Sequence, residues 1–125
     1  MTHVQPRLLG ISSTRFDVEA SLPPDPITFC EWIDVEIKAT REPELFGGEN
    51  FAVMVCSSTW IANEVAIRGG LWGHKYLIVH AWDHALVTRY LEALCSNGSG
   101  PDWPTVVRNL SRYLSVDTID FSPDE

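Results

Sequence analysis

Hydrophobic residues in the second quarter of the chain recur at every second position, and this alternation constrains the fold most strongly. Within residues 29–39, aliphatic and charged residues take turns along the chain. The aliphatic set is Ile33, Val35 and Ile37, and the charged set is Asp34, Glu36 and Lys38. Successive side chains of a strand point to opposite faces of a sheet, so this period of two predicts a strand with one buried and one wet face.

Three further segments are typical of strands. Residues 51–56 are apolar on both parities, which predicts a central strand covered on both faces. Residues 75–81 predict another strand, and residues 4–11 a short first strand that Pro6 weakens or restricts to an edge. The polar residues 40–50, with the Gly47-Gly48 pair, predict a loop that turns the chain back between the second and third strands.

The last third of the chain changes to the helical spacing of three and four residues. Asp83 is a plausible cap for one helix and Asp102 for the next, with Pro104 in its first turn. Apolar stripes follow each cap, at Leu86, Val87, Tyr90, Leu91 and Leu94, and then at Trp103, Val106, Val107, Leu110, Tyr113 and Leu114. Ser57 and its neighbours offer the cap of a shorter helix after residue 56.

Strands first and helices last predict an α+β fold. We expect an antiparallel sheet of about four strands, with a short helix between strands and two C-terminal amphipathic helices packed on one face. A length of 125 residues suits one compact core, so residues 1–125 are expected to form a single α+β domain.

Charge narrows the range of partners. Seventeen acidic residues against nine Lys and Arg leave a net charge of −8, which repels phosphate backbones and anionic lipids. We therefore expect no nucleic-acid or membrane partner, and a basic protein fits better. The longest apolar run, residues 51–56, is far shorter than the roughly 20 residues needed to span a bilayer. The charged N-terminal region does not resemble a signal peptide, so a cytoplasmic protein is expected.

Candidate catalytic and metal-binding residues are few. The nearest approach to such a site is His80, Asp83 and His84, with His74 upstream. His80 belongs to a predicted strand and Asp83 is better employed as a helix cap, so no convergent set of zinc ligands is completed. A small enzyme using His80 and Asp83 remains the alternative to a binding protein.

The three cysteines do not suggest a disulfide framework. Cys30, Cys56 and Cys95 are odd in number, lie far apart and form no Cys-x-x-Cys pair. We expect buried free thiols, and a fold that needs no disulfide, metal or cofactor.

The side of the alternating strand that faces water carries a tryptophan. Trp32 shares its parity with Asp34 and Glu36, and a Trp beside two acids predicts an interface anchor with an electrostatic frame. The alternative is that the N-terminal segment or the proline-rich residues 21–28 fold over it. A second candidate surface is the acidic loop, with Glu42, Glu44 and Glu49.

Three stretches of the sequence are similar to the immunity protein 8 family of bacterial polymorphic toxin systems. They are FAVMVCSSTWI, WGHKYLIVHAWDHALVTRYLEALC and WPTVVRNLSRYLSVDTIDF, preceded by a proline-rich entry, PPDPITF. The resemblance covers the chain from about residue 23 to residue 121. It departs at Ser58, where proline is expected, and at Val116, where an aromatic residue is expected.

The resemblance implies a cytoplasmic, non-enzymatic protein that binds and neutralises a cognate secreted toxin domain. Many such toxins are basic nucleases, and an acidic inhibitor would be steered rapidly to a basic nuclease. No catalytic residues carry over from the family. The oligomeric state is not indicated by the sequence.

Overall fold

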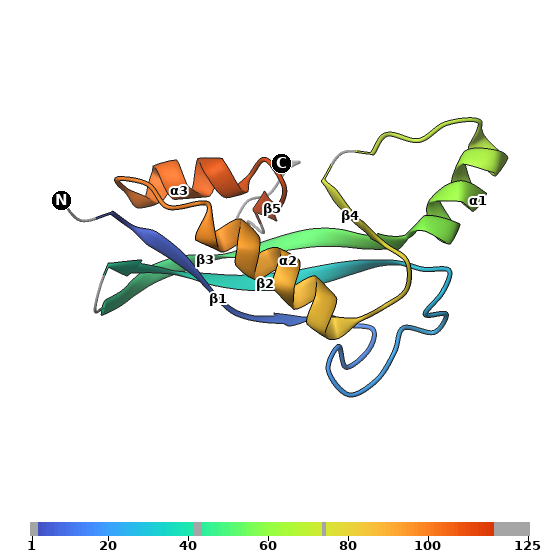
Figure 1. Cartoon of the computed structure of the whole chain (residues 1–125), viewed down its shortest axis with the longest axis horizontal. Coiled ribbons are helices and arrows are strands. Elements are labelled where there is room, and N and C mark those ends of the chain that lie inside the picture. The colour runs from blue at the N-terminus through green and yellow to red at the C-terminus, as the bar shows by residue number, and fades with distance from the viewer. Residues whose placement is uncertain (1–2, 42–43, 74, 117–125) are drawn as a thin grey trace, which may run out of the picture.

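The computed structural model describes residues 3–41, 44–73 and 75–116, and it has the predicted α+β class (Figure 1). In chain order the elements are β1 (Gln5–Ser12), β2 (Cys30–Arg41), β3 (Glu44–Ser57), α1 (Ser58–Arg68), β4 (Tyr76–Val79), α2 (His84–Ser96), α3 (Trp103–Leu110) and β5 (Ser115–Val116). Within these ranges no helix is long and apolar enough to cross a membrane.

The sheet is mostly antiparallel, as the sequence predicted, but one of its strand pairs is parallel. Its order is β1-β2-β3-β4, with β5 also paired to β3. β1, β2 and β3 are antiparallel neighbours, but β4 runs parallel to β3. The reason is the crossover through α1, which returns the chain so that β4 enters the sheet in the direction of β3. β4 and β5 pair with different residues along the same edge of β3.

The hairpin of β2 and β3 is longer than predicted. β2 continues to Arg41 and β3 starts at Glu44, so most of the expected loop at residues 40–50 belongs to the strand pair. The register passes from Lys38 opposite Gly48 to Ala39 opposite Phe46, so Gly47 is an extra residue on β3. The Gly47-Gly48 pair therefore marks a β-bulge inside a long hairpin rather than the turn that its composition suggested.

The predicted helix caps are confirmed. Asp83 Oδ1 accepts a hydrogen bond from Leu86 N at 3.2 Å, and Asp102 Oδ1 accepts one from Thr105 N at 2.9 Å. Ser57 Oγ caps α1 by accepting from Trp60 N at 3.1 Å. These side chains satisfy backbone donors that the first turn of a helix leaves without partners.

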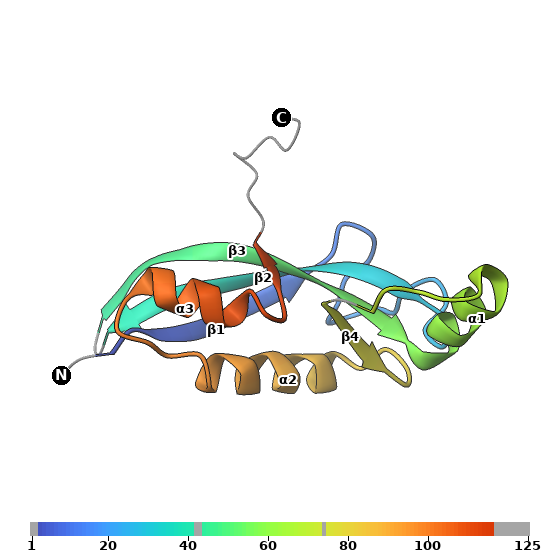
Figure 2. The ribbon, with the colours of Figure 1, turned by 90° about the horizontal axis from the view of Figure 1, so that it is seen from above.

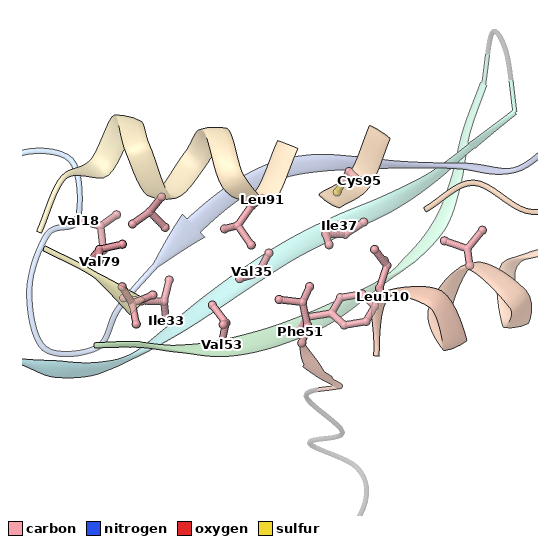
Figure 3. Packing of buried hydrophobic residues seen from close by; sticks show 14 of the residues in the cluster. Val18, Ile33, Val35, Ile37, Phe51, Val53, Val79, Leu91, Cys95 and Leu110 are labelled. Atoms are coloured by element: carbon pink, nitrogen blue, oxygen red, sulfur yellow. The ribbon is translucent and has the colours of Figure 1, made fainter. Parts of the chain in front are cut away.

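The core lies between the sheet and one helix layer. Figure 2 shows α2 and α3 on the same side of the sheet, as the sequence predicted, with α1 at the end of the sheet beyond β3. Ile33, Val35 and Ile37 are 0–1% exposed and point toward this layer, where they meet Leu91 of α2 and Leu110 of α3 (Figure 3). We call this side of β2 the inner face.

The start of β1 is tied to the connection between α2 and α3. Val4 N donates to Gly100 O at 2.7 Å, and Gly100 N donates back to Val4 O at 3.0 Å. Gln5 Nε2 donates to Cys95 O at 3.2 Å. Residues about 95 positions apart in the chain are thereby held together.

Candidate partner-binding face

The side of the sheet opposite α2 and α3 carries the residues that the sequence predicted to bind a partner. Directly opposite residues of an antiparallel pair share one face, so each candidate on β2 brings a neighbour from β3. We call the resulting set the outer face. It consists of Trp32 with Met54, Asp34 with Ala52, and Glu36 with Asn50. In the part of the chain that the structure describes, no helix covers this face (Figure 2).

Trp32 is 48% exposed although it lies inside a twelve-residue strand. The connector between β1 and β2 was the alternative cover for this side chain, but it packs around Trp82. The Trp82 ring meets Phe16 and Phe29 edge to face, with ring centroids 5.1 and 6.1 Å apart, and Trp82 N donates to Pro26 O. Trp32 therefore leaves about half of a large amphipathic side chain at the surface, and this residue type is favoured at protein interfaces.

The charges of this side of β2 change sign along the strand. Asp34 and Glu36 follow Trp32 at every second position of β2, so the three residues share one face. Asp34 is half-buried there and Glu36 is exposed. The next residue of that parity is Lys38, whose Nζ lies 4.0 Å from Glu36 Oε2, and Arg7 of β1 pairs with Lys38. The acidic frame of Trp32 thus ends at a basic edge. The negative charge of this face therefore lies toward Trp32, and the positive charge toward the hairpin end.

Glu49 of the predicted acidic loop does not extend this face. Glu49 pairs with Ile37, which belongs to the inner face, and Glu49 is half-buried there. Glu44 begins β3 and pairs with Arg41, whereas Glu42 lies outside the described residues. The structure therefore brings Trp32, Asp34 and Glu36 together and separates Glu49 from them.

The alternative site near His80 and Asp83 finds no support among the described residues, and His74 lies outside them. His80 follows β4 and is exposed, and the Asp83 carboxylate is engaged as the cap of α2. His84 is half-buried in the first turn of that helix. Among the described residues, no group of three or more His, Cys, Asp or Glu side chains is arranged to hold a metal ion.

A groove on the helix side was not predicted. It encloses about 760 Å³ between β4, α2 and the residues after α3, and it is lined by Tyr76, Tyr90 and Tyr113 with Lys75 and Arg112. The sequence placed Tyr90 and Tyr113 in apolar stripes, but they are 55% and 60% exposed, so that prediction was wrong for these two residues. The sequence did offer a clue, because tyrosine keeps its hydroxyl group in water and therefore suits the exposed edge of an apolar stripe.

The sequence also missed the neighbourhood of two cysteines. Cys30 at the start of β2 pairs with Cys56 near the end of β3, and their sulfur atoms lie 2.8 Å apart. The available signal was the hairpin itself, because pairing outward from the turn brings the two positions into register. The sequence assigned residues 40–50 to a loop, and without the true position of the turn the register of the two cysteines could not be derived.

An exposed tryptophan beside carboxylates, on a sheet face that none of the described helices covers, is a surface suited to binding another protein. The fold that carries this face is a small α+β domain. The family model of Immunity protein 8 matches residues 7–118, so the chain belongs to the Immunity protein 8 family. Membership implies a non-enzymatic inhibitor that neutralises a cognate toxin. Comparison with curated proteins and with solved structures gives no match.

Proposed function

We propose that this immunity protein neutralises its toxin in the cytoplasm of the cell that makes both proteins, and that it binds the toxin through the outer face. The observation that carries this proposal is the 48% exposure of Trp32 on a sheet face that α2 and α3 leave open. A large ring fixed on a β-strand loses little conformational freedom on binding, so it can act as the central anchor of an interface.

We further propose that the toxin domain presents a basic surface. The net charge of −8 supports long-range attraction, and Asp34 and Glu36 supply negative charge next to the anchor. A basic nuclease is one toxin of this kind. Opposite charges raise the rate of encounter more than they raise the lifetime of a complex.

The test begins with the gene next to the one that encodes this chain. A large multidomain protein with a variable C-terminal domain is expected there, and that domain is co-expressed with the immunity protein and captured. Trp32→Ala should weaken the complex by roughly 2 kcal/mol or more, which is about 30-fold in Kd. Circular dichroism and the melting temperature would show that the variant is folded.

A matched control uses an aromatic residue of similar exposure on the other side of the sheet. Tyr113→Ala alters the groove, and its ring is 60% exposed. We expect Tyr113→Ala to change Kd by less than about threefold, because substitutions at surface positions outside an interface usually have small energetic effects. A large loss with Tyr113→Ala and none with Trp32→Ala would move the toxin contact from the outer face to the groove.

A kinetic measurement tests the charge argument separately. The association rate constant of the wild-type complex should fall roughly tenfold or more between low and physiological salt, while the dissociation rate constant changes much less. An association rate constant that does not change with salt would refute electrostatic steering. The Trp32 contact would then be judged from the affinity of Trp32→Ala alone.

A further inference from the structure

We infer that Cys30 and Cys56 form a dithiol site that peroxides convert reversibly into an intrachain disulfide. The two residues are direct cross-strand partners in the β2–β3 hairpin, and their sulfur atoms are 2.8 Å apart. This inference concerns the end of the hairpin next to the outer face and does not depend on toxin binding.

Two hydrogen bonds between Phe29 and Ser57 hold the backbone next to the pair. Ser57 N donates to Phe29 O at 2.9 Å, and Phe29 N donates to Ser57 Oγ at 3.1 Å. Because hydrogen-bonded and non-hydrogen-bonded pairs alternate along an antiparallel ladder, these bonds make Cys30–Cys56 a non-hydrogen-bonded pair. Such pairs place their Cα atoms about 4.5 Å apart, within the range of about 4.4–6.8 Å that disulfides bridge. The hairpin therefore needs no rearrangement to accept the bond.

The two thiols differ in access and in protonation. Cys30 is half-buried and Cys56 is fully buried, so an oxidant in solution reaches Cys30 first. The hydrogen bond with Cys56 lowers the pKa of Cys30, although burial and the charges of Glu31 and Glu64 act against it. The pKa of Cys56 is raised by the same hydrogen bond and by burial. Cys30 is therefore the attacking thiolate, and Cys56 is the resolving thiol.

The oxidation balances with a peroxide as the only co-reactant. The Cys30 thiolate attacks one oxygen of hydrogen peroxide, breaks the O–O bond and becomes a sulfenic acid, while the other oxygen leaves as water after taking up a proton. The Cys56 sulfur then attacks the Cys30 sulfur, loses its proton and displaces the hydroxyl group as a second water. Overall, two thiols lose two hydrogens and one peroxide yields two waters. A dithiol reductant reverses the change.

Cys95 provides an internal comparison within the same chain. It is buried near the end of α2, and burial, together with the charge of Glu92, raises the pKa of its thiol to about 11. It has neither the access nor the thiolate character of Cys30, so it should stay reduced under conditions that link the other two.

The experiment exposes reduced, purified protein to hydrogen peroxide, then alkylates the remaining thiols in denaturant and measures intact and peptide masses. We expect a monomer that has lost two hydrogens, a peptide linking Cys30 to Cys56, and alkylation of Cys95 alone. Dithiothreitol should restore three free thiols. The melting temperature of the oxidised form should be several degrees higher, because the bond restricts the unfolded chain.

Two variants and one condition isolate the role of the hairpin. Cys95→Ser should leave the linkage intact, and Cys30→Ser, which keeps the buried Cys56 in place, should abolish it. In strong denaturant the same peroxide should form the 30–56 link at least about tenfold more slowly, because the folded hairpin holds the sulfurs in contact. Alkylation of all three cysteines after peroxide, a sulfinic acid on Cys30 with Cys56 still free, or a bond between two chains would each overturn the proposal.

Discussion

The two faces of β2 are made from the same strand, yet they are constrained by different forces. On the inner face Ile33, Val35 and Ile37 are at most 1% exposed and pack against the helix layer. On the outer face Trp32 is 48% exposed, and Glu36 is in water. The difference shows that packing of the core constrains the residues on the inner face, whereas residues on the outer face can be selected for binding a partner.

Acidic residues make the same contrast more sharply. Glu31 lies on the inner parity with its side chain 5% exposed, and its Oε1 is 2.8 Å from Nε of Arg15. Glu36 lies on the outer parity with its side chain 52% exposed, and Lys38 Nζ approaches it only to 4.0 Å. One carboxylate is therefore a buried group that needs its cation, and the other is a surface charge available for a partner.

The largest expected effect breaks the inner face. Ile33→Ala removes a fully buried side chain and should lower the free energy of unfolding by about 2–5 kcal/mol, measured by urea denaturation. Ile33→Val is the graded control, with an expected loss of about 0.5–1.5 kcal/mol. If Trp32→Ala destabilised the protein as much as Ile33→Ala does, a second layer would have to cover the outer face, contrary to its exposure here.

The next effect tests the buried acid. Arg15→Ala should lower the free energy of unfolding by roughly 1–3 kcal/mol, because it leaves the Glu31 carboxylate buried without its partner. We place the expected value at the lower end, since the Arg15 side chain is itself 62% exposed and water can screen the pair. Restoring stability with the double variant Arg15→Ala, Glu31→Gln would confirm that the loss comes from the unpaired charge.

The outer acid should behave in the opposite way. Glu36→Ala is expected to change the free energy of unfolding by less than about 0.5 kcal/mol, as at most surface positions. In toxin-binding measurements the same variant should slow association and leave dissociation nearly unchanged, because an exposed charge acts mainly on encounter. A stability loss comparable with that of Arg15→Ala would remove the distinction between the two carboxylates.

The smallest effect concerns pH and lies outside the sheet. Hydrogen bonds from Thr105 lower the pKa of the Asp102 carboxyl at the start of α3. A depressed folded-state pKa means that this group adds stability above its unfolded pKa, about 3.9, and that the contribution is lost as pH falls through the folded value. Asp102→Asn should therefore flatten the acid end of the stability profile slightly. An unchanged profile would show that the acid sensitivity of the fold arises elsewhere.

Local patterns predicted the parts of the fold that are decided locally. Alternation located the buried parity of β2, and the carboxylates of Asp83 and Asp102 act as the caps that their positions suggested. The same alternation predicted that Trp32 lies on the outer face together with Asp34 and Glu36. The family resemblance was confirmed over residues 7–118.

Features that depend on distant residues were not predictable in this way. The direction of β4 depends on how α1 returns the chain, and the Gly47-Gly48 pair has the composition of a turn although the ladder absorbs it as a bulge. The Cys30–Cys56 contact and the separation of Glu49 from the outer face both depend on register. Register is set by pairing across a hairpin, and a single-residue bulge changes which residues share a face.

The hydrogen bonds between Val4 and Gly100 can form only late in the synthesis of the chain. A ribosome releases β1, β2 and β3 long before Gly100, so the hairpin can form while the partner of Val4 has not yet been made. The start of β1 is then secured only when the connection between α2 and α3 has emerged and packed. A newly translated chain thus acquires its finished helix layer late, and we expect a truncated nascent chain that ends before Gly100 to remain sensitive to proteases.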